Sequence, residues 1–170
     1  MKDVYEQLRE KLDKFPIGMP DSAEAIEILK IYYSPEEAQL ALKLSMLNKS
    51  LEDIAAELDE DIDALQQKLD RMAAKGTVYA KAKNGKRIYS MLPSVEQFSE
   101  APFWPGKKDE TFVKLAPLWR KYFDSKFVHE VGDRKTPMMR VIPMDTTISN
   151  ESQVTPYEDL EKLLEQNRTH

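Results

Sequence analysis

The sequence contains no cysteine, only two histidines and only five glycines among its 170 residues. Without thiols, these residues can form neither disulfides nor cysteine-ligated metal centres, and they provide no thiolate nucleophile. The glycines are scattered, whereas a phosphate-binding loop needs closely spaced glycines ahead of a helix. Several large classes of catalytic and metal site are therefore excluded within this chain.

Other catalytic patterns are missing too. No Ser-His-Asp arrangement is suggested, there is no HExxH motif, and no paired carboxylates stand in an apolar setting. His170 is the last residue, and His129 follows a predicted aromatic helix. A histidine there is more simply interpreted as a helix-end residue that favours the negative dipole than as a general base. We therefore expect a protein that is not an enzyme and that holds no metal ion in this chain.

Long hydrophobic runs are also absent. No stretch approaches the roughly 18 apolar residues of a membrane span, and the first residues are charged where a secretory signal needs an apolar run. These features predict a soluble, cytoplasmic protein with no membrane contact. The formal net charge of -5 opposes general affinity for nucleic acid, although a local basic patch can survive within an acidic total.

What the sequence does contain is helical periodicity. An amphipathic helix is predicted over 4–15, and a more apolar one follows a cap at Asp21 or Ser22. A third helix begins at Ser34, where a serine N-cap, a proline at N1 and Glu37 at N3 form a capping box.

Two further helices and a hairpin follow. Ser50 caps a short helix over 51–58, and the next helix carries a stripe from Ile62 to Met72 and stops at Gly76. Strands are predicted over 78–82 and 87–92, joined by Asn84-Gly85 in a type I′ turn. Helix, helix, helix and hairpin is the winged-helix order. We therefore predict a mainly α fold with a small β-hairpin wing, in which residues 1–92 form a winged helix-turn-helix core with an N-terminal helix.

Residues 93–170 are predicted to be a helical extension and linker that packs on the first part. After an irregular aromatic connector over 93–105, a helix starts at Asp109 or Thr111, and Pro117 either kinks it or marks its true beginning. Weak alternation over 138–143 and a short helix over 156–166 complete the chain. One broad face of the long helix predicts core packing or a subunit interface, with a homodimer as one form of it, and it comprises Phe112, Leu115, Trp119, Tyr122, Phe123 and Phe127.

DNA binding by the winged helix receives mixed support. Over 51–70 there are eight acids and a single base, Lys68, which gives a surface that repels phosphate. Acids in the first turns of successive helices complement the helix dipoles, so their density needs no ligand. The wing lysines also have a simple structural role, since lysine commonly solvates and blunts an exposed hairpin edge. The candidate DNA contacts are Gln66, Gln67, Lys68, Arg71, Lys75, Lys81, Lys83, Lys86 and Arg87.

Four stretches in order add a resemblance to a known family. They are Val4–Leu12, Ile28–Lys30 leading into Tyr33–Ala38, Leu69–Gly76, and Arg140–Pro143 before Pro156–Leu160. Their order resembles the N-terminal region of ferredoxin-type 4Fe-4S proteins from anaerobic bacteria. In that family, cysteine-rich segments after the closing helix hold iron-sulfur clusters, and the presumed role is electron transfer. Those cysteines are missing here, so the resemblance assigns no cluster ligand to this chain.

Two functions from different classes follow. The first is a non-catalytic accessory domain that positions an iron-sulfur electron carrier, its own C-terminal domain, against a partner protein. A 4Fe-4S cluster is then expected only if the full-length protein carries a cysteine-rich C-terminal domain. Because the family's cluster domain would begin where this chain stops, we expect a shortened chain or a cluster-free member. The alternative is a winged-helix transcriptional regulator that binds DNA and dimerises through the aromatic helix.

Overall fold

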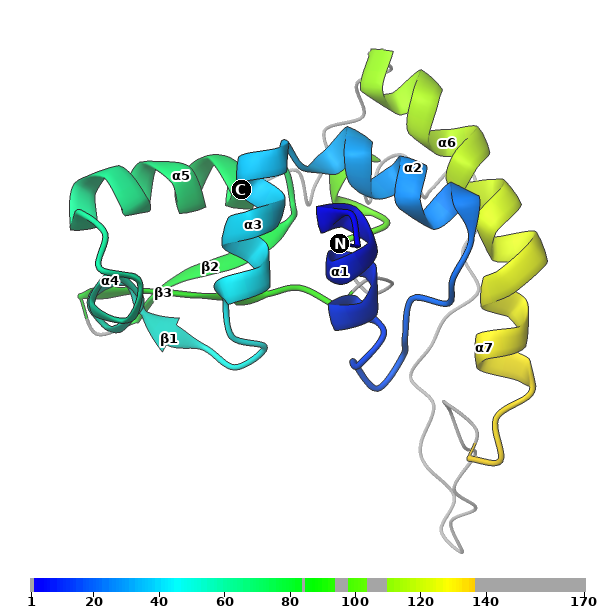
Figure 1. Ribbon diagram of the computed structural model, residues 1–170, viewed down its shortest axis with the longest axis horizontal. Helices are drawn as coiled ribbons and strands as arrows, with labels where there is room; N and C mark the ends of the chain where they lie inside the picture. The colour runs from blue at the N-terminus through cyan, green and yellow to red at the C-terminus, as the bar shows by residue number, and fades with distance from the viewer. Residues whose placement is uncertain (1, 84, 94–97, 104–109, 137–170) are drawn as a thin grey trace, which may run out of the picture. The chain divides into compact units, whose positions relative to one another are not determined.

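The structure is a computed structural model that describes residues 2–83, 85–93, 98–103 and 110–136 (Figure 1). The chain divides into two compact units, Met1–Met138 and Met139–His170, and every described residue belongs to the first. This unit is mainly helical, as the sequence predicts, and its small antiparallel sheet has three strands where a two-stranded hairpin was predicted. The predicted strand over 138–143 and helix over 156–166 lie outside the described residues. No helix in the described ranges is long and apolar enough to cross a membrane.

The first three helices are α1 (Val4–Leu12), α2 (Ala23–Tyr32) and α3 (Pro35–Lys43). All three were predicted, but α1 ends three residues earlier than the predicted range of 4–15. Of the two proposed caps for α2, Ser22 is the one used, and its hydroxyl accepts a hydrogen bond from the Ala25 amide at 3.0 Å. The capping box at the start of α3 is complete. Local sequence chemistry thus sets where these helices begin.

A short strand, β1 (Lys49–Ser50), precedes α4 (Leu51–Leu58), which is followed by α5 (Ile62–Ala74) and by the hairpin strands β2 (Val78–Lys83) and β3 (Lys86–Met91). The strand order is β1-β3-β2. β1 was not predicted, because two residues are too few to show an alternating pattern. The hairpin was predicted with strand ends that differ by one residue, and Gly85 has the positive φ of 75° that a primed turn needs.

The last described helix is a continuous rod of three parts: α6 (Glu110–Tyr122), a π-helical turn η2 (Phe123–Phe127) and α7 (Val128–Gly132). Because α6 starts at Glu110, Pro117 lies inside the helix and is not its true beginning. Figure 1 shows α6 running beside α2, and the two helices pack together.

A buried aromatic cluster joins α2, α6 and the connector between β3 and α6. The Trp119 Nε1 atom donates to the Tyr32 hydroxyl at 3.2 Å, and that hydroxyl donates to the Phe98 carbonyl oxygen at 2.9 Å. Phe98 is fully buried, and the connector ends in a short 3-10 helix, η1 (Ala101–Phe103). The part of the predicted connector that is described is therefore packed, whereas Trp104 lies outside the described residues.

A lysine ties α1 to the end of α3. The Lys11 Nζ atom donates to the carbonyl oxygens of Ala41 and Leu42 at 3.0 and 2.8 Å, and also to that of Leu44. The last carbonyls of a helix have no partners within the helix, so this ammonium group satisfies acceptors that α3 cannot satisfy itself. Burial lowers the pKa of Lys11, and the positive charge of Lys14 acts in the same direction.

Candidate interaction surface

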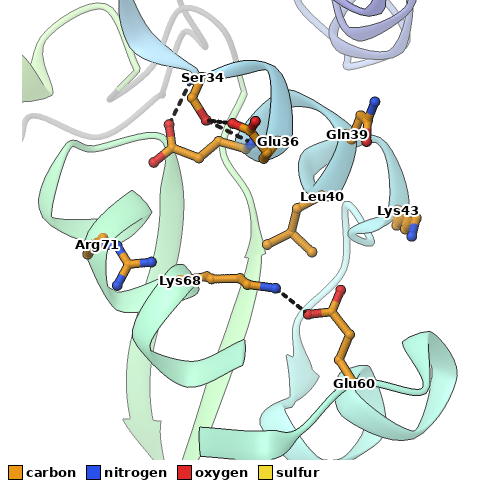
Figure 2. A pocket seen from close by; sticks show the side chains of 9 residues that line it. Ser34, Glu36, Gln39, Leu40, Lys43, Glu60, Lys68 and Arg71 are labelled. Carbon is orange, nitrogen blue, oxygen red and sulfur yellow. Dashed lines mark hydrogen bonds and ion pairs between the residues drawn. The ribbon is translucent and has the colours of Figure 1, made fainter. Parts of the chain in front are cut away.

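The candidate surface is formed by α3, α5 and the β2–β3 hairpin. It contains a groove of about 490 Å³ between α3 and α5 (Figure 2). Leu40 lies across the groove from α5 and supplies its apolar part, and charged side chains of both signs surround it. The lining residues are Ser34, Glu36, Glu37, Gln39, Leu40, Lys43, Glu60, Lys68 and Arg71.

Two of the lysines proposed as DNA contacts are bound to carboxylates within the chain. The Lys68 Nζ atom lies 2.7 Å from a Glu60 carboxylate oxygen, and Figure 2 shows this pair beside Leu40. The Lys75 Nζ atom lies 2.7 Å from both carboxylate oxygens of Glu37. Glu37 also accepts from the Ser34 amide at 2.9 Å, so one side chain caps α3 and holds the end of α5.

Arg71 differs from these lysines. None of the described acids lies within ion-pair distance of its guanidinium, and the same holds for the ammonium group of Lys43. Both side chains line the groove, with Leu40 between the helices that carry them. The groove therefore combines an apolar wall with two cations that have no described counter-ion.

Asp70 connects α5 to the hairpin. Its carboxylate accepts from the Tyr89 hydroxyl at 2.8 Å and from Arg87 Nη2 at 3.0 Å, and Gln66 Nε2 lies 3.5 Å away. Burial, together with the hydrogen bond to Asp70, raises the pKa of Tyr89 to about 12. Two more of the proposed DNA contacts, Gln66 and Arg87, are thus engaged by a single residue of the acidic run over 51–70.

The remaining proposed contacts lie apart from this cluster. Gln67 is exposed on α5, and Lys81 and Lys86 are exposed on the hairpin strands. The side chain of Lys83 lies outside the described part of the chain. The structure thus gathers Lys68, Arg71 and Lys75 on the side of α5 facing α3, and places Lys81 and Lys86 on the hairpin.

The acidic residues around α4 and α5 have local structural partners. Asp61 is the N-cap of α5 and accepts from the Ala64 amide at 2.9 Å. Ser50 caps α4 and donates its hydroxyl to Asp53 at 2.6 Å, while Glu57 pairs with Lys49 at 2.6 Å. These contacts account for much of the acidic run without any ligand.

No metal or cluster site is found among the described residues. They contain no group of three or more histidine, cysteine or acidic side chains placed to hold a metal ion. The whole chain lacks cysteine, so its residues do not fit a 4Fe-4S cluster, which is held by thiolates. His129 is exposed on α7, with its Nδ1 atom 3.1 Å from an Asp133 carboxylate oxygen.

The aromatic face of the long helix is buried only in part. Leu115, Trp119 and Tyr122 are buried in the core, whereas Phe112, Phe123 and Phe127 are only partly buried. Two shallow hollows of about 520 and 610 Å³ follow this outer side. Both are lined by Phe123 and Asp124, so they are consecutive along the rod.

In comparisons with protein-family models, with curated proteins and with solved structures, nothing matched this chain.

Proposed function

We propose that residues 35–91 form a winged helix that acts as a non-catalytic protein-interaction module. The element order supports this: α3, β1, α4, α5 and the β2–β3 hairpin follow one another, and β1 pairs with the second hairpin strand. A winged helix requires three helices followed by a hairpin, with a short strand that joins the hairpin to form the sheet. In this arrangement α5 takes the place of the recognition helix and the hairpin that of the wing.

The observation that carries the protein-binding proposal is the engagement of the basic side chains within the chain. Lys68, Lys75 and Arg87 each pair with a carboxylate, and these acids would stand beside any phosphate bound there. DNA recognition needs free donors for phosphates and base edges, in an environment that attracts anions. The α5 side of the surface meets this need poorly.

The groove indicates what a partner would present. Arg71 and Lys43 can each receive a carboxylate, and Leu40 offers apolar contact between them. A partner segment with an acidic residue next to an apolar one is the matching chemistry. Arginine is the stronger anchor, because its planar fork can hold a carboxylate through two hydrogen bonds.

The resemblance to ferredoxin-type 4Fe-4S proteins suggests which kind of partner the module binds. We propose an accessory role toward an iron-sulfur electron carrier in the cytoplasm, with every cluster ligand supplied from outside these residues. The coding sequence after His170 tests this first. Closely spaced cysteines there would support the proposal, and binding of that cysteine-rich segment should weaken in an Arg71→Glu variant but not in a Lys14→Glu control. A stop codon directly after His170 would count against a carrier domain in the same chain.

DNA binding remains the second candidate, because Lys81 and Lys86 are exposed on the hairpin and pair with no acid in the described part of the chain. Fluorescence anisotropy of a labelled random-sequence duplex at low salt, where electrostatic binding is strongest, decides between the two. We expect no binding at micromolar protein. Steeply salt-dependent binding that a Lys81→Glu/Lys86→Glu variant abolishes would replace the protein-interaction proposal with the DNA-binding one.

A further inference from the structure

The outer side of the α6–η2–α7 rod carries an apolar stripe, in which Trp119 belongs to the core and Phe123 and Phe127 are only partly buried against it. The stripe is defined by the residues that line its two hollows. Its members recur along the rod at intervals of one, three and four residues, which keeps them on one side. They are Phe112, Ala116, Trp119, Arg120, Phe123, Asp124, Phe127, Val128, Val131 and Gly132.

The stripe is held in a fixed shape by aromatic contacts. The rings of Trp119 and Phe123 stack with centroids 5.3 Å apart, and Phe123 meets Phe127 edge to face at 5.2 Å. Trp119 is anchored by its hydrogen bond to Tyr32 in the core. A surface whose rings are already ordered loses little side-chain entropy when it is covered, which favours binding.

Two charges interrupt the stripe, and they have opposite signs. The side chains of Arg120 and Asp124 are 86% and 74% exposed, and their only contact with each other is a loose one of 3.8 Å across one helical turn. An exposed pair of this kind contributes little to stability. Both side chains are therefore available to a partner. A partner helix complements them when it places an acid opposite Arg120 and, one turn further along, a base opposite Asp124.

A second copy of the same rod offers that order. When two rods lie antiparallel around a two-fold axis level with Tyr122, Arg120 of each comes opposite Asp124 of the other. The same register places Ala116 opposite Val128 and the large Phe112 opposite Gly132. Two-fold interfaces require this kind of self-complementarity, in which one patch matches its own reversed image.

We propose that the chain forms an antiparallel homodimer through this stripe, with two Arg120–Asp124 pairs across the interface. The apolar stripe provides the burial, and the charge pairs fix the direction and register. This inference concerns a surface separate from the α3–α5 groove and does not depend on the proposed function.

Charge reversal in the whole chain tests the register. Sedimentation equilibrium should show a reversible dimer for the natural sequence. Arg120→Glu and Asp124→Arg should each weaken dimerisation by at least about tenfold, since like charges then meet across the axis twice. Lys114→Glu, an exposed charge change on α6 outside the stripe, should leave the dimer unchanged.

The decisive experiment mixes the two weakened variants in equal amounts. An Arg120→Glu copy and an Asp124→Arg copy have complementary charges at both contacts, so the mixture should form a heterodimer about as strong as the natural homodimer. Rescue in the mixture cannot come from a contact within one chain. A natural chain that stays monomeric, single variants that dimerise normally, or a mixture without rescue would each overturn the proposal.

Discussion

Three buried tyrosine hydroxyls in the core differ in their hydrogen bonding. The Tyr33 hydroxyl donates to the Thr77 carbonyl at 3.1 Å, and the Tyr32 hydroxyl both donates and accepts. The Tyr122 hydroxyl is buried with no hydrogen-bond partner in the described structure. A buried hydroxyl without a partner has lost its hydration and gained nothing in return.

The substitutions Tyr122→Phe and Tyr32→Phe should therefore differ in sign. Removal of the Tyr122 hydroxyl should leave the free energy of unfolding unchanged or raise it by up to about 1 kcal/mol, because an unsatisfied group is removed. Removal of the Tyr32 hydroxyl should lower it by about 1–3 kcal/mol, because the Trp119 donor loses its acceptor. Urea denaturation of both variants measures the difference, and a larger loss for Tyr122→Phe would contradict this account.

Elements whose signals are local could be predicted from the sequence, and those defined by distant contacts could not. The capping box at Ser34 and the glycine at position 76 each involve only a few neighbouring residues. The start of α3 and the end of α5 were therefore predicted correctly. β1 exists only because Lys49 and Ser50 pair with β3. The π-helical turn also leaves no periodic signature, since the residues 123–127 read as an ordinary amphipathic helix.

The candidate site follows the same rule. The basic residues of α5 could be recognised as a group from their spacing in the sequence. Their partners could not, because Glu37 and Asp70 meet Lys75 and Arg87 only after different elements have packed together. Sequence reasoning therefore identified the charged side chains but not which of them remain free.

Substitution by alanine should cost different amounts of stability at two glycines that have the same φ. Gly76 and Gly85 both have φ of 75°, but a Cβ atom at Gly76 would lie 2.0 Å from the Ala101 Cβ, whereas none would be within 4 Å at Gly85. Gly85→Ala should cost about 1–2 kcal/mol, the usual cost of left-handed backbone for alanine. Gly76→Ala should cost more than about 3 kcal/mol, because η1 must also move. Thermal and urea unfolding measure both losses of unfolding free energy. Equal losses for the two variants would show that Ala101 moves aside at no cost in free energy.

For the whole molecule, burial of several tyrosines predicts unfolding at alkaline pH. Burial raises the pKa of Tyr32, Tyr33 and Tyr122 well above the ordinary value of 10, and that of Tyr89 to about 12. The folded state therefore holds these protons more tightly than the unfolded state does. This contribution to stability is complete below pH 10 and is lost as the pH rises from 10 toward the folded-state values.

The test is a pair of titrations. The free energy of unfolding should be flat up to about pH 10 and fall above it, and tyrosinate absorbance should rise together with loss of the folded circular dichroism signal. Tyrosines that all ionise near pH 10 while the chain stays folded would show that their hydroxyls are accessible to solvent.

The π-helical turn at 123–127 also determines which kinds of length change the rod tolerates. A π turn holds one residue more than an α turn, and one residue corresponds to about 100° of rotation around a helix axis. Deletion of a single residue here would therefore restore a regular α turn and keep α7 on nearly the side that it occupies now, so Val128 and Val131 would stay on the side on which Phe112 and Ala116 lie. Deletion of a single residue from an α-helical part of the rod would instead rotate the helix beyond it by about 100° and cut the apolar stripe in two.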